Sequence, residues 1–209
     1  SNFSTALLIF IMSTMIIFIA GYKLKHLTVL FFLFIFLISS FLLAVNKFPD
    51  IIPNRVDTWT NRIENFVNND IDDTSNYQIN RAKAAIANGK IFGVGAGKSS
   101  MKYVLPQSTS DFIFSIIAEE YGIIVSLIIL LLYVVLLFRI IITSYRSETK
   151  FGQLVSIAVG IPVVFQAFTN MAVAVQLIPV TGQPLPLVSA GGTSIWITFL
   201  AMGILLSVS

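Results

Sequence analysis

The chain has 209 residues, of which 56% are hydrophobic and only 11% are charged. A soluble globular domain carries about 25% charged residues, so this composition excludes an ordinary soluble protein and indicates an integral membrane protein. The net charge of +3 comes from scattered rather than clustered basic residues, which argues against nucleic-acid binding and suits an anionic membrane surface.

Five apolar segments have the length of a membrane-spanning helix, about 20 residues. They are predicted at about residues 3–20, 27–45, 112–138, 154–177 and 191–208. Helices are expected because a backbone in lipid must satisfy its hydrogen bonds internally. The sequence therefore predicts an all-α, polytopic helical bundle. We expect residues 1–209 to be the C-terminal part of a longer protein, since the chain opens on an apolar run without an initiator methionine.

Basic residues indicate how the predicted bundle is oriented. They gather in two short loops, which contain Lys23 and Lys25 in the first case and Arg139, Arg146 and Lys150 in the second. Short loops rich in lysine and arginine face the cytoplasm. The 46–111 loop and the 178–190 loop are then expected on the outer side of the membrane.

The 46–111 loop spans about 65 residues, which is too long for a passive connector. Residues 77–88 have helical spacing, and Gly89 is a typical C-terminal stop, so a short surface helix is predicted there. The turn that follows, 93–99, superficially resembles a phosphate loop, but Phe92 stands where a Walker A motif needs its first glycine. Two interpretations remain open: an anion-binding turn assisted by Lys98 and Lys102, or a plain glycine turn.

Asp111 lies where the polar loop meets the third apolar segment. A carboxylate there suits the N-cap of a helix, and it equally suits a general base at the membrane surface. Glu119 and Glu120 follow within the apolar segment, where charges are costly and indicate function by default. At 100° per residue Glu119 projects about 80° from Asp111 and Glu120 about 180°, so we expect only Glu119 to face a cavity.

The glutamates need compensation for burial. Partners in a missing part of the protein, protonation, a wet cavity and a structural bond between helices are all compatible with the sequence. Gln166 and Asn170, four residues apart, are predicted to form a polar seam between helices. The proline-rich 178–190 loop is expected to fold back into the protein.

These motifs, in this order, resemble the C-terminal half of the SEDS family (shape, elongation, division, sporulation), and more closely its division-type FtsW branch than its RodA branch. The residues that carry the resemblance are the 93–99 turn, Lys102, Leu105-Pro106, Asp111-Phe112-Ile113-Phe114, Glu119-Glu120-Tyr121-Gly122, Leu185-Pro186-Leu187-Val188-Ser189 and Gly191-Gly192. The chain departs from the family pattern at Gln107, Thr109, Ser110 and Ala190.

The resemblance implies a protein of about ten spans, with five in residues 1–209. It implies a peptidoglycan glycosyltransferase that polymerises lipid II at the outer face of the bacterial cytoplasmic membrane, at the division septum. It also implies a class B penicillin-binding protein and divisome membrane proteins as partners, membrane lipid as surroundings, and no nucleic acid. The catalytic aspartate of the family carries over to Asp111, here as general base.

Further assignments follow from the chemistry of that reaction. Pyrophosphate leaves with negative charge, so Lys102, Arg62 and Lys98 are candidate substrate contacts, with Glu119 as a fourth substrate-binding candidate. A divalent cation, Mg²⁺ or Mn²⁺, is expected to assist, and no organic cofactor is expected. Asp70, Asp72 and Asp73 are interpreted as a solvated turn. Alternatives are a lipid II flippase, an elongation-type polymerase and a non-catalytic scaffold.

Overall fold

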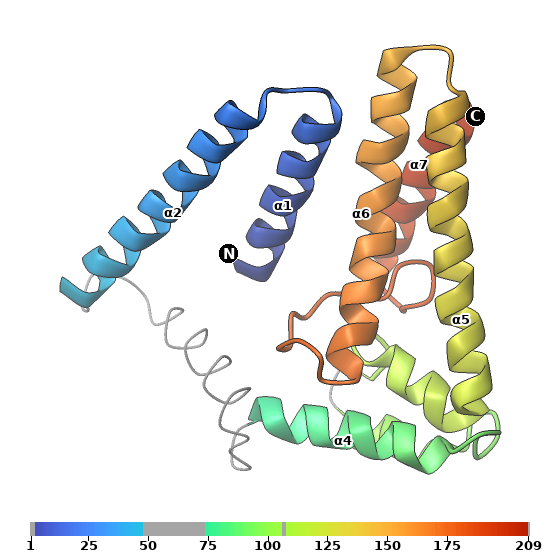
Figure 1. Ribbon diagram of the computed structural model, residues 1–209. Coiled ribbons are helices and arrows are strands. Elements are labelled where there is room, and N and C mark those ends of the chain that lie inside the picture. Colours follow the sequence, from blue (N-terminus) through green and yellow to red (C-terminus); the bar gives the residue numbers. More distant parts are fainter. Residues whose placement is uncertain (1–2, 48–73, 106–107, 209) are drawn as a thin grey trace.

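Figure 1 shows a computed structural model of the protein, which describes residues 3–47, 74–105 and 108–208. Its elements are α1 (Phe3–Ile19), α2 (Leu24–Lys47), α4 (Thr74–Gly89), the 3-10 turn η1 (Met101–Tyr103), α5 (Ile113–Arg146), α6 (Lys150–Ala174) and α7 (Gly192–Val208). The described ranges contain helices and no strand, so the expectation of an all-helical protein is confirmed.

Each predicted span contains a helix. α5 and α6 are long and apolar enough to cross a membrane, and shorter apolar stretches occur at Thr5–Ile19, Leu24–Ser40 and Gly192–Val208. The boundaries of both short loops were wrong. Lys25 lies on α2, Arg139 and Arg146 lie on α5, and Lys150 begins α6, so only residues 147–149 connect α5 to α6. Long arginine side chains reach water from the end of an apolar helix, so the helix need not stop before them.

The centre of the bundle is the contact of α5 with α6 and α7. Ile140 of α5, Val164 of α6 and Leu205 of α7 form a buried apolar cluster. A Cβ on Gly160 would lie 2.7 Å from Ile140 Cγ2, so the absence of a side chain lets α5 and α6 approach closely. α1 packs on α6 from the other side, as Figure 1 also shows.

The two ends of the bundle differ in character. The α1–α2 turn and the α5–α6 connection lie at one end, and α4 crosses the opposite end together with the 175–191 segment (Figure 1). The apolar face of α4 includes Ala82 and Ala85, each 0% exposed, and α4 packs mainly against α5.

The predicted surface helix at 77–88 is present as α4, and Gly89 is its last residue. The reason for the glycine differs from the expected one. Lys90, not Gly89, adopts the left-handed conformation after the helix, with φ 49°. A Cβ on Gly89 would lie 1.9 Å from the Ala118 carbonyl oxygen, so glycine is needed for close contact with α5.

Candidate functional site

Asp111 lies directly before α5, at the end of the bundle that carries α4. The N-cap residue of α5 is Phe112, and no side chain caps the helix there. The N-cap alternative for Ser110 or Asp111 is therefore wrong. The Asp111 carboxylate is half-buried, and its Oδ1 accepts a hydrogen bond from Ser110 Oγ at 2.8 Å. The carboxylate is thus half-buried beside the start of α5, and it does not cap that helix.

The backbone around Asp111 is held at three successive carbonyls. Thr109 O accepts from the Ala190 amide at 3.0 Å, and Ser110 O accepts from Ser189 Oγ at 2.6 Å. Asp111 O accepts from Asn170 Nδ2 at 2.7 Å. Donors from α6 and from the 175–191 segment therefore fix the chain from which the carboxylate projects.

The 175–191 segment folds into the protein, with Leu185 and Pro186 fully buried. Its carbonyls accept hydrogen bonds from the bundle: Gln166 Nε2 donates to Pro184 O at 3.1 Å, and the Tyr133 hydroxyl donates to Pro186 O. Gln183 Nε2 donates in turn to Thr5 Oγ1 of α1 at 2.8 Å. The segment is consequently tied to α1, α5 and α6.

Gln166 and Asn170 do not form the predicted seam between helices. Both side-chain amides bind the 175–191 segment, Gln166 at Pro184 O and Asn170 at Gln183 O. Main-chain carbonyls of a folded-back loop offer acceptors that the sequence does not reveal. The segment also passes near the carboxylate at Gly182, where a Cβ would lie 3.5 Å from Asp111 Oδ2.

Glu119 is 1% exposed and accepts hydrogen bonds from four donors. The donors are Asn88 Nδ2 at 3.4 Å, Ser99 Oγ, Ser100 Oγ at 2.9 Å and the Met101 amide at 3.3 Å. The compensation for this buried carboxylate thus comes from neutral donors within this chain, which favours the structural-bond alternative. Glu119 holds the end of α4 and the start of η1 against α5.

The 93–99 turn docks on a break in α5. Gly122 has φ 80° and ψ 179°, which interrupts the helix and frees carbonyls on its N-terminal side. The amides of Val94 and Gly95 donate to Glu119 O and Glu120 O, each at 2.9 Å. Because these two amides are occupied, they do not face an anion, and the plain-turn interpretation is favoured.

The predicted cationic contacts are only partly described. Lys98 and Lys102 are exposed, and the Lys102 amide donates to Ser99 Oγ at 3.0 Å. Arg62 lies outside the described residues, as do the aspartates at 70, 72 and 73. Within the described ranges no three His, Cys, Asp or Glu side chains gather where they would hold a metal ion.

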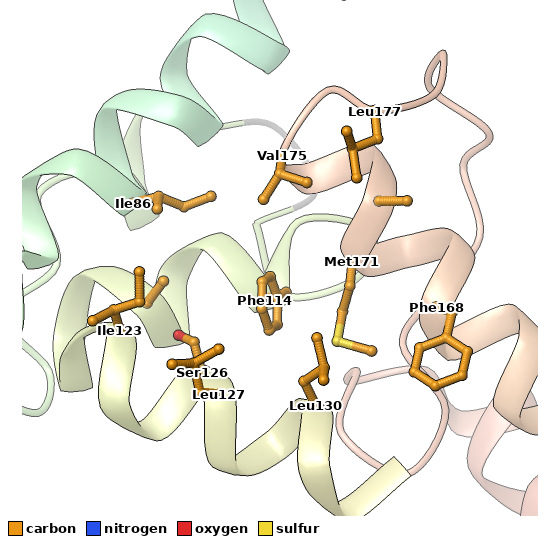
Figure 2. Close-up of a pocket in the computed structure, with 12 residues that line it drawn as sticks. Ile86, Phe114, Ile123, Ser126, Leu127, Leu130, Phe168, Met171, Val175 and Leu177 are labelled. Atoms are coloured by element: carbon orange, nitrogen blue, oxygen red, sulfur yellow. The ribbon is translucent and has the colours of Figure 1, made fainter. Parts of the chain in front are cut away.

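An apolar groove of about 290 Å³ lies between α4, α5 and α6 (Figure 2). Ile86 of α4, Leu130 of α5 and Met171 of α6 line it from three sides. Ser126 is the polar lining side chain, and its hydroxyl donates to Gly122 O at 3.1 Å. The groove therefore offers hydrocarbon contacts, and it begins close to the Asp111 segment at Phe114.

The hydrogen bonds of two buried serines near the candidate site were not predicted from the sequence. Ser189 and Ser99 are 2% exposed, and each links segments far apart in the chain. Ser189 joins Leu185 N to Ser110 O, and Ser99 joins the Lys102 amide to Glu119. Both serines lie in motifs that carry the family resemblance, but serine is common in loops, so the residue type did not reveal these partners.

Comparison with known proteins gives a consistent result. The model of the FtsW/RodA/SpoVE family, described as "Cell cycle protein", matches residues 1–209. A probable peptidoglycan glycosyltransferase FtsW of Bacillus subtilis is 32% identical over 211 aligned residues, covering 100% of this chain and 52% of the relative. Stage V sporulation protein E of the same organism is 36% identical over 196 residues, covering 92% and 50%.

A probable FtsW of Enterococcus hirae is 42% identical over 134 residues, which cover 64% of this chain and 34% of the relative. A solved structure concerned with polymerization and crosslinking by a peptidoglycan synthase complex contains a chain of the same fold, with a TM-score of 0.71 and 26% identity. That match covers 99% of this chain and 55% of the other. The chain thus spans about half the length of the relatives that it matches along its whole course.

Proposed function

Because the chain belongs to the FtsW/RodA/SpoVE family of cell cycle proteins, we propose that it is part of a peptidoglycan glycosyltransferase that polymerises lipid II during cell division. Asp111 carries this proposal. Its carboxylate is half-buried, does not cap α5, and projects from a backbone held at three carbonyls. A helix cap would explain an aspartate at this position, and that explanation is excluded.

In the proposed reaction, Asp111 is the general base. A sugar hydroxyl of the acceptor attacks the anomeric carbon of the donor, and the new glycosidic C–O bond forms while the bond to pyrophosphate breaks. The hydroxyl proton passes to the Asp111 carboxylate, and polyprenyl pyrophosphate leaves. A carboxylate within hydrogen-bond reach of the hydroxyl contributes about 10²–10⁴-fold to such a step.

The leaving pyrophosphate needs positive charge nearby. Lys102 is proposed as one contact, because it is exposed and its amide is fixed through Ser99 to Glu119. Lys98 and Arg62 remain candidates for the same role. The described residues do not supply a multi-carboxylate metal site, so we propose Mg²⁺ or Mn²⁺ only as a companion of the pyrophosphate and assign it no protein ligand.

The apolar groove suits the hydrocarbon tail of such a substrate. Its walls come from α4, α5 and α6, and its lining residue Phe114 follows Asp111 by three positions. A tail lying there would leave the polar headgroup beside the α4 end of the bundle, where Asp111 lies. Buried apolar surface contributes about 25 cal/mol per Å², so a long chain in the groove would hold the substrate at the membrane surface.

Division partners follow from the same assignment. The matched solved structure is a synthase complex for polymerization and crosslinking, which supports a class B penicillin-binding protein as partner of the whole protein. We propose the cytoplasmic membrane at the septum as its location, with the α4 end facing outward. The relatives named FtsW support the division-type assignment over the elongation-type one.

The flippase alternative depends on acidic residues that line a path for the headgroup. Glu119 is 1% exposed and already accepts from Asn88, Ser99, Ser100 and Met101, so it offers little to a moving substrate. The buried state of this carboxylate therefore disfavours transport.

A leaflet-controlled assay separates the two functions. The full-length protein, with its penicillin-binding partner, is placed in liposomes that carry lipid II only in the leaflet facing the α4 end. Glycan strands are the expected product. Movement of lipid II across the bilayer without any glycan would overturn the proposal in favour of transport, and partner binding with neither activity would favour a scaffold.

A further inference from the structure

Asn170 is a buried polar residue that takes no part in the proposed reaction steps. It lies near the end of α6, is 1% exposed, and uses both amide hydrogens. Nδ2 donates at 2.7 Å to Asp111 O and at 2.7 Å to Gln183 O. One side chain thus joins α6, the segment before α5 and the 175–191 segment.

The contact with Asp111 acts on the backbone rather than on the carboxylate. Asp111 O lies one residue before the N-cap Phe112, at the point where the chain enters α5. The preceding carbonyls of Thr109 and Ser110 are held by Ala190 and Ser189. Asn170 supplies the third attachment, and it is the one that originates from a long helix rather than from a loop.

The second contact, from Asn170 to Gln183 O, holds the 175–191 segment near the Asp111 carboxylate. Gln183 follows Gly182, where an added Cβ would lie 3.5 Å from Asp111 Oδ2. By holding Gln183 O and Asp111 O together, Asn170 sets the separation between the carboxylate and the 175–191 segment. A general base must be held within hydrogen-bond reach of its proton, and a displacement of about 1 Å costs about 10²-fold in rate.

The two ends of the Asn170 amide differ in their hydrogen bonding. Asn170 Oδ1 is buried and has no hydrogen-bond partner among the described residues. A buried acceptor without a partner destabilises the folded state. The two donors of Asn170, by contrast, reach Asp111 O and Gln183 O, the carbonyls beside the proposed base.

We propose that Asn170 is the positioning residue of the site, which fixes Asp111 and the 175–191 segment at a set separation. This inference rests on the proposed function and assigns Asn170 no contact with substrate. It acts through Asp111, so its loss lowers the turnover of bound substrate rather than the binding of substrate.

Gln166 provides a matched control. It lies one helical turn earlier on α6 and donates its side-chain amide to the same segment, at Pro184 O, without reaching Asp111. Asn170→Ala and Gln166→Ala each remove one amide that binds the 175–191 segment. Only the first removes a bond to the Asp111 backbone.

The test measures kcat and KM for lipid II polymerisation by the full-length protein with its partner, together with thermal stability. Asn170→Ala is expected to lower kcat about tenfold or more with KM little changed, while Gln166→Ala keeps kcat near wild type. Asn170→Ser, which keeps one donor in a small side chain, is expected to fall between wild type and Asn170→Ala.

Equal losses of kcat in Asn170→Ala and Gln166→Ala would overturn the inference, as would a rise in KM alone or unchanged kinetics. If Asn170→Ala does not fold, Asn170→Ser decides in the same way against Gln166→Ala. Lack of polymerisation by the wild-type protein would instead contradict the proposed function, so the two failures are distinguishable.

Discussion

Asp111 owes its position to hydrogen bonds that involve its backbone and those of its neighbours. The carbonyls of residues 109–111 accept from Ala190, Ser189 and Asn170, while the carboxylate accepts from Ser110. A backbone fixed in this way leaves the side chain available for chemistry. It also means that the geometry of the proposed base depends on donors 59 to 81 residues further along the chain.

Lys102 allows a test of the charge assigned to the leaving pyrophosphate. Lys102→Ala is expected to lower the polymerisation rate about tenfold or more, because the developing negative charge loses a cation. Lys102→Arg is expected to retain part of the activity, since it keeps the charge but changes its geometry. The measurement is glycan formation by the full-length protein at saturating lipid II.

Lys83→Ala is the control for net charge, since Lys83 is an exposed lysine on α4. It should leave the rate unchanged. Equal effects of Lys83→Ala and Lys102→Ala would show that only the overall surface charge matters and would remove Lys102 from the site.

At this scale the sequence predicted the type of residue better than its contacts. Asp111 was singled out because a carboxylate at the border of an apolar segment is unusual, and its role as general base stays a prediction. The partners of Glu119 were not, because Ser99, Ser100 and Asn88 are neutral and lie 19 to 31 residues away. A charged residue in an apolar segment is easily recognised in the sequence, whereas the neutral donors that bind it cannot be told from other polar residues.

Among the elements, α5 is unusual in being two helical pieces joined at Gly122. The break exposes Glu119 O and Glu120 O, and the 93–99 turn supplies Val94 and Gly95 amides to them. The Ile123 amide on the far side of the break donates to Lys90 O at 3.0 Å. The glycine-rich turn is therefore a docking element for a broken helix.

Gly93 and Gly97 separate the effect of close packing from that of backbone conformation. Both have positive φ, 79° and 73°, but a Cβ on Gly93 would lie 2.2 Å from Glu120 O, whereas nothing lies within 4 Å of one on Gly97. Gly97→Ala is expected to lower the free energy of unfolding by about 1 kcal/mol, from strain alone. Gly93→Ala is expected to cost clearly more, about 3 kcal/mol, because backbone must move.

Unfolding of the full-length protein in detergent micelles measures both values. Equal destabilisation by the two substitutions would show that the turn is not packed against α5 as described. The wild-type protein and Gly203→Ala, where a Cβ on α7 meets nothing within 4 Å, provide the reference for a harmless glycine substitution.

Helices were predictable here, and their exact ends and breaks were not. Apolar length predicted a helix in each of five segments, of which α5 and α6 are long enough to cross a membrane, and helical spacing with Gly89 located α4. The sequence did not reveal the break at Gly122, because a glycine in an apolar helix is common and its φ depends on Gly93 and Ile91 packing beside it. Nor did it show that α5 continues to Arg146.

Across the whole molecule, the elements that form the candidate site lie at one end. α4, the turn that follows it and the 175–191 segment lie at that end, and the α1–α2 and α5–α6 connections lie at the other (Figure 1). Asn170 joins Asp111 O to Gln183 O of the 175–191 segment. The basic residues used to orient the chain, including Lys23 and Arg146, fall near the second end. This arrangement supports an outward-facing site above a cytoplasmic basic end.

Cysteine labelling tests that orientation, because the 209 residues contain no cysteine. Tyr103, 86% exposed, lies at the proposed outer end, and Glu148, also exposed, lies in the α5–α6 connection. In a full-length protein without other cysteines, Tyr103→Cys is expected to react with a membrane-impermeant maleimide in intact cells. Glu148→Cys is expected to react only after the membrane is opened, and the reverse pattern would invert the proposed topology.

The most direct measurement is lipid II polymerisation by the full-length protein with its penicillin-binding partner, wild type against Asp111→Asn. The asparagine keeps the shape of the side chain and removes the base. Glycan formation is predicted to fall by about 10²–10⁴-fold, with thermal stability and partner binding unchanged. Glycan formation at the wild-type rate would contradict the assignment of Asp111 as general base.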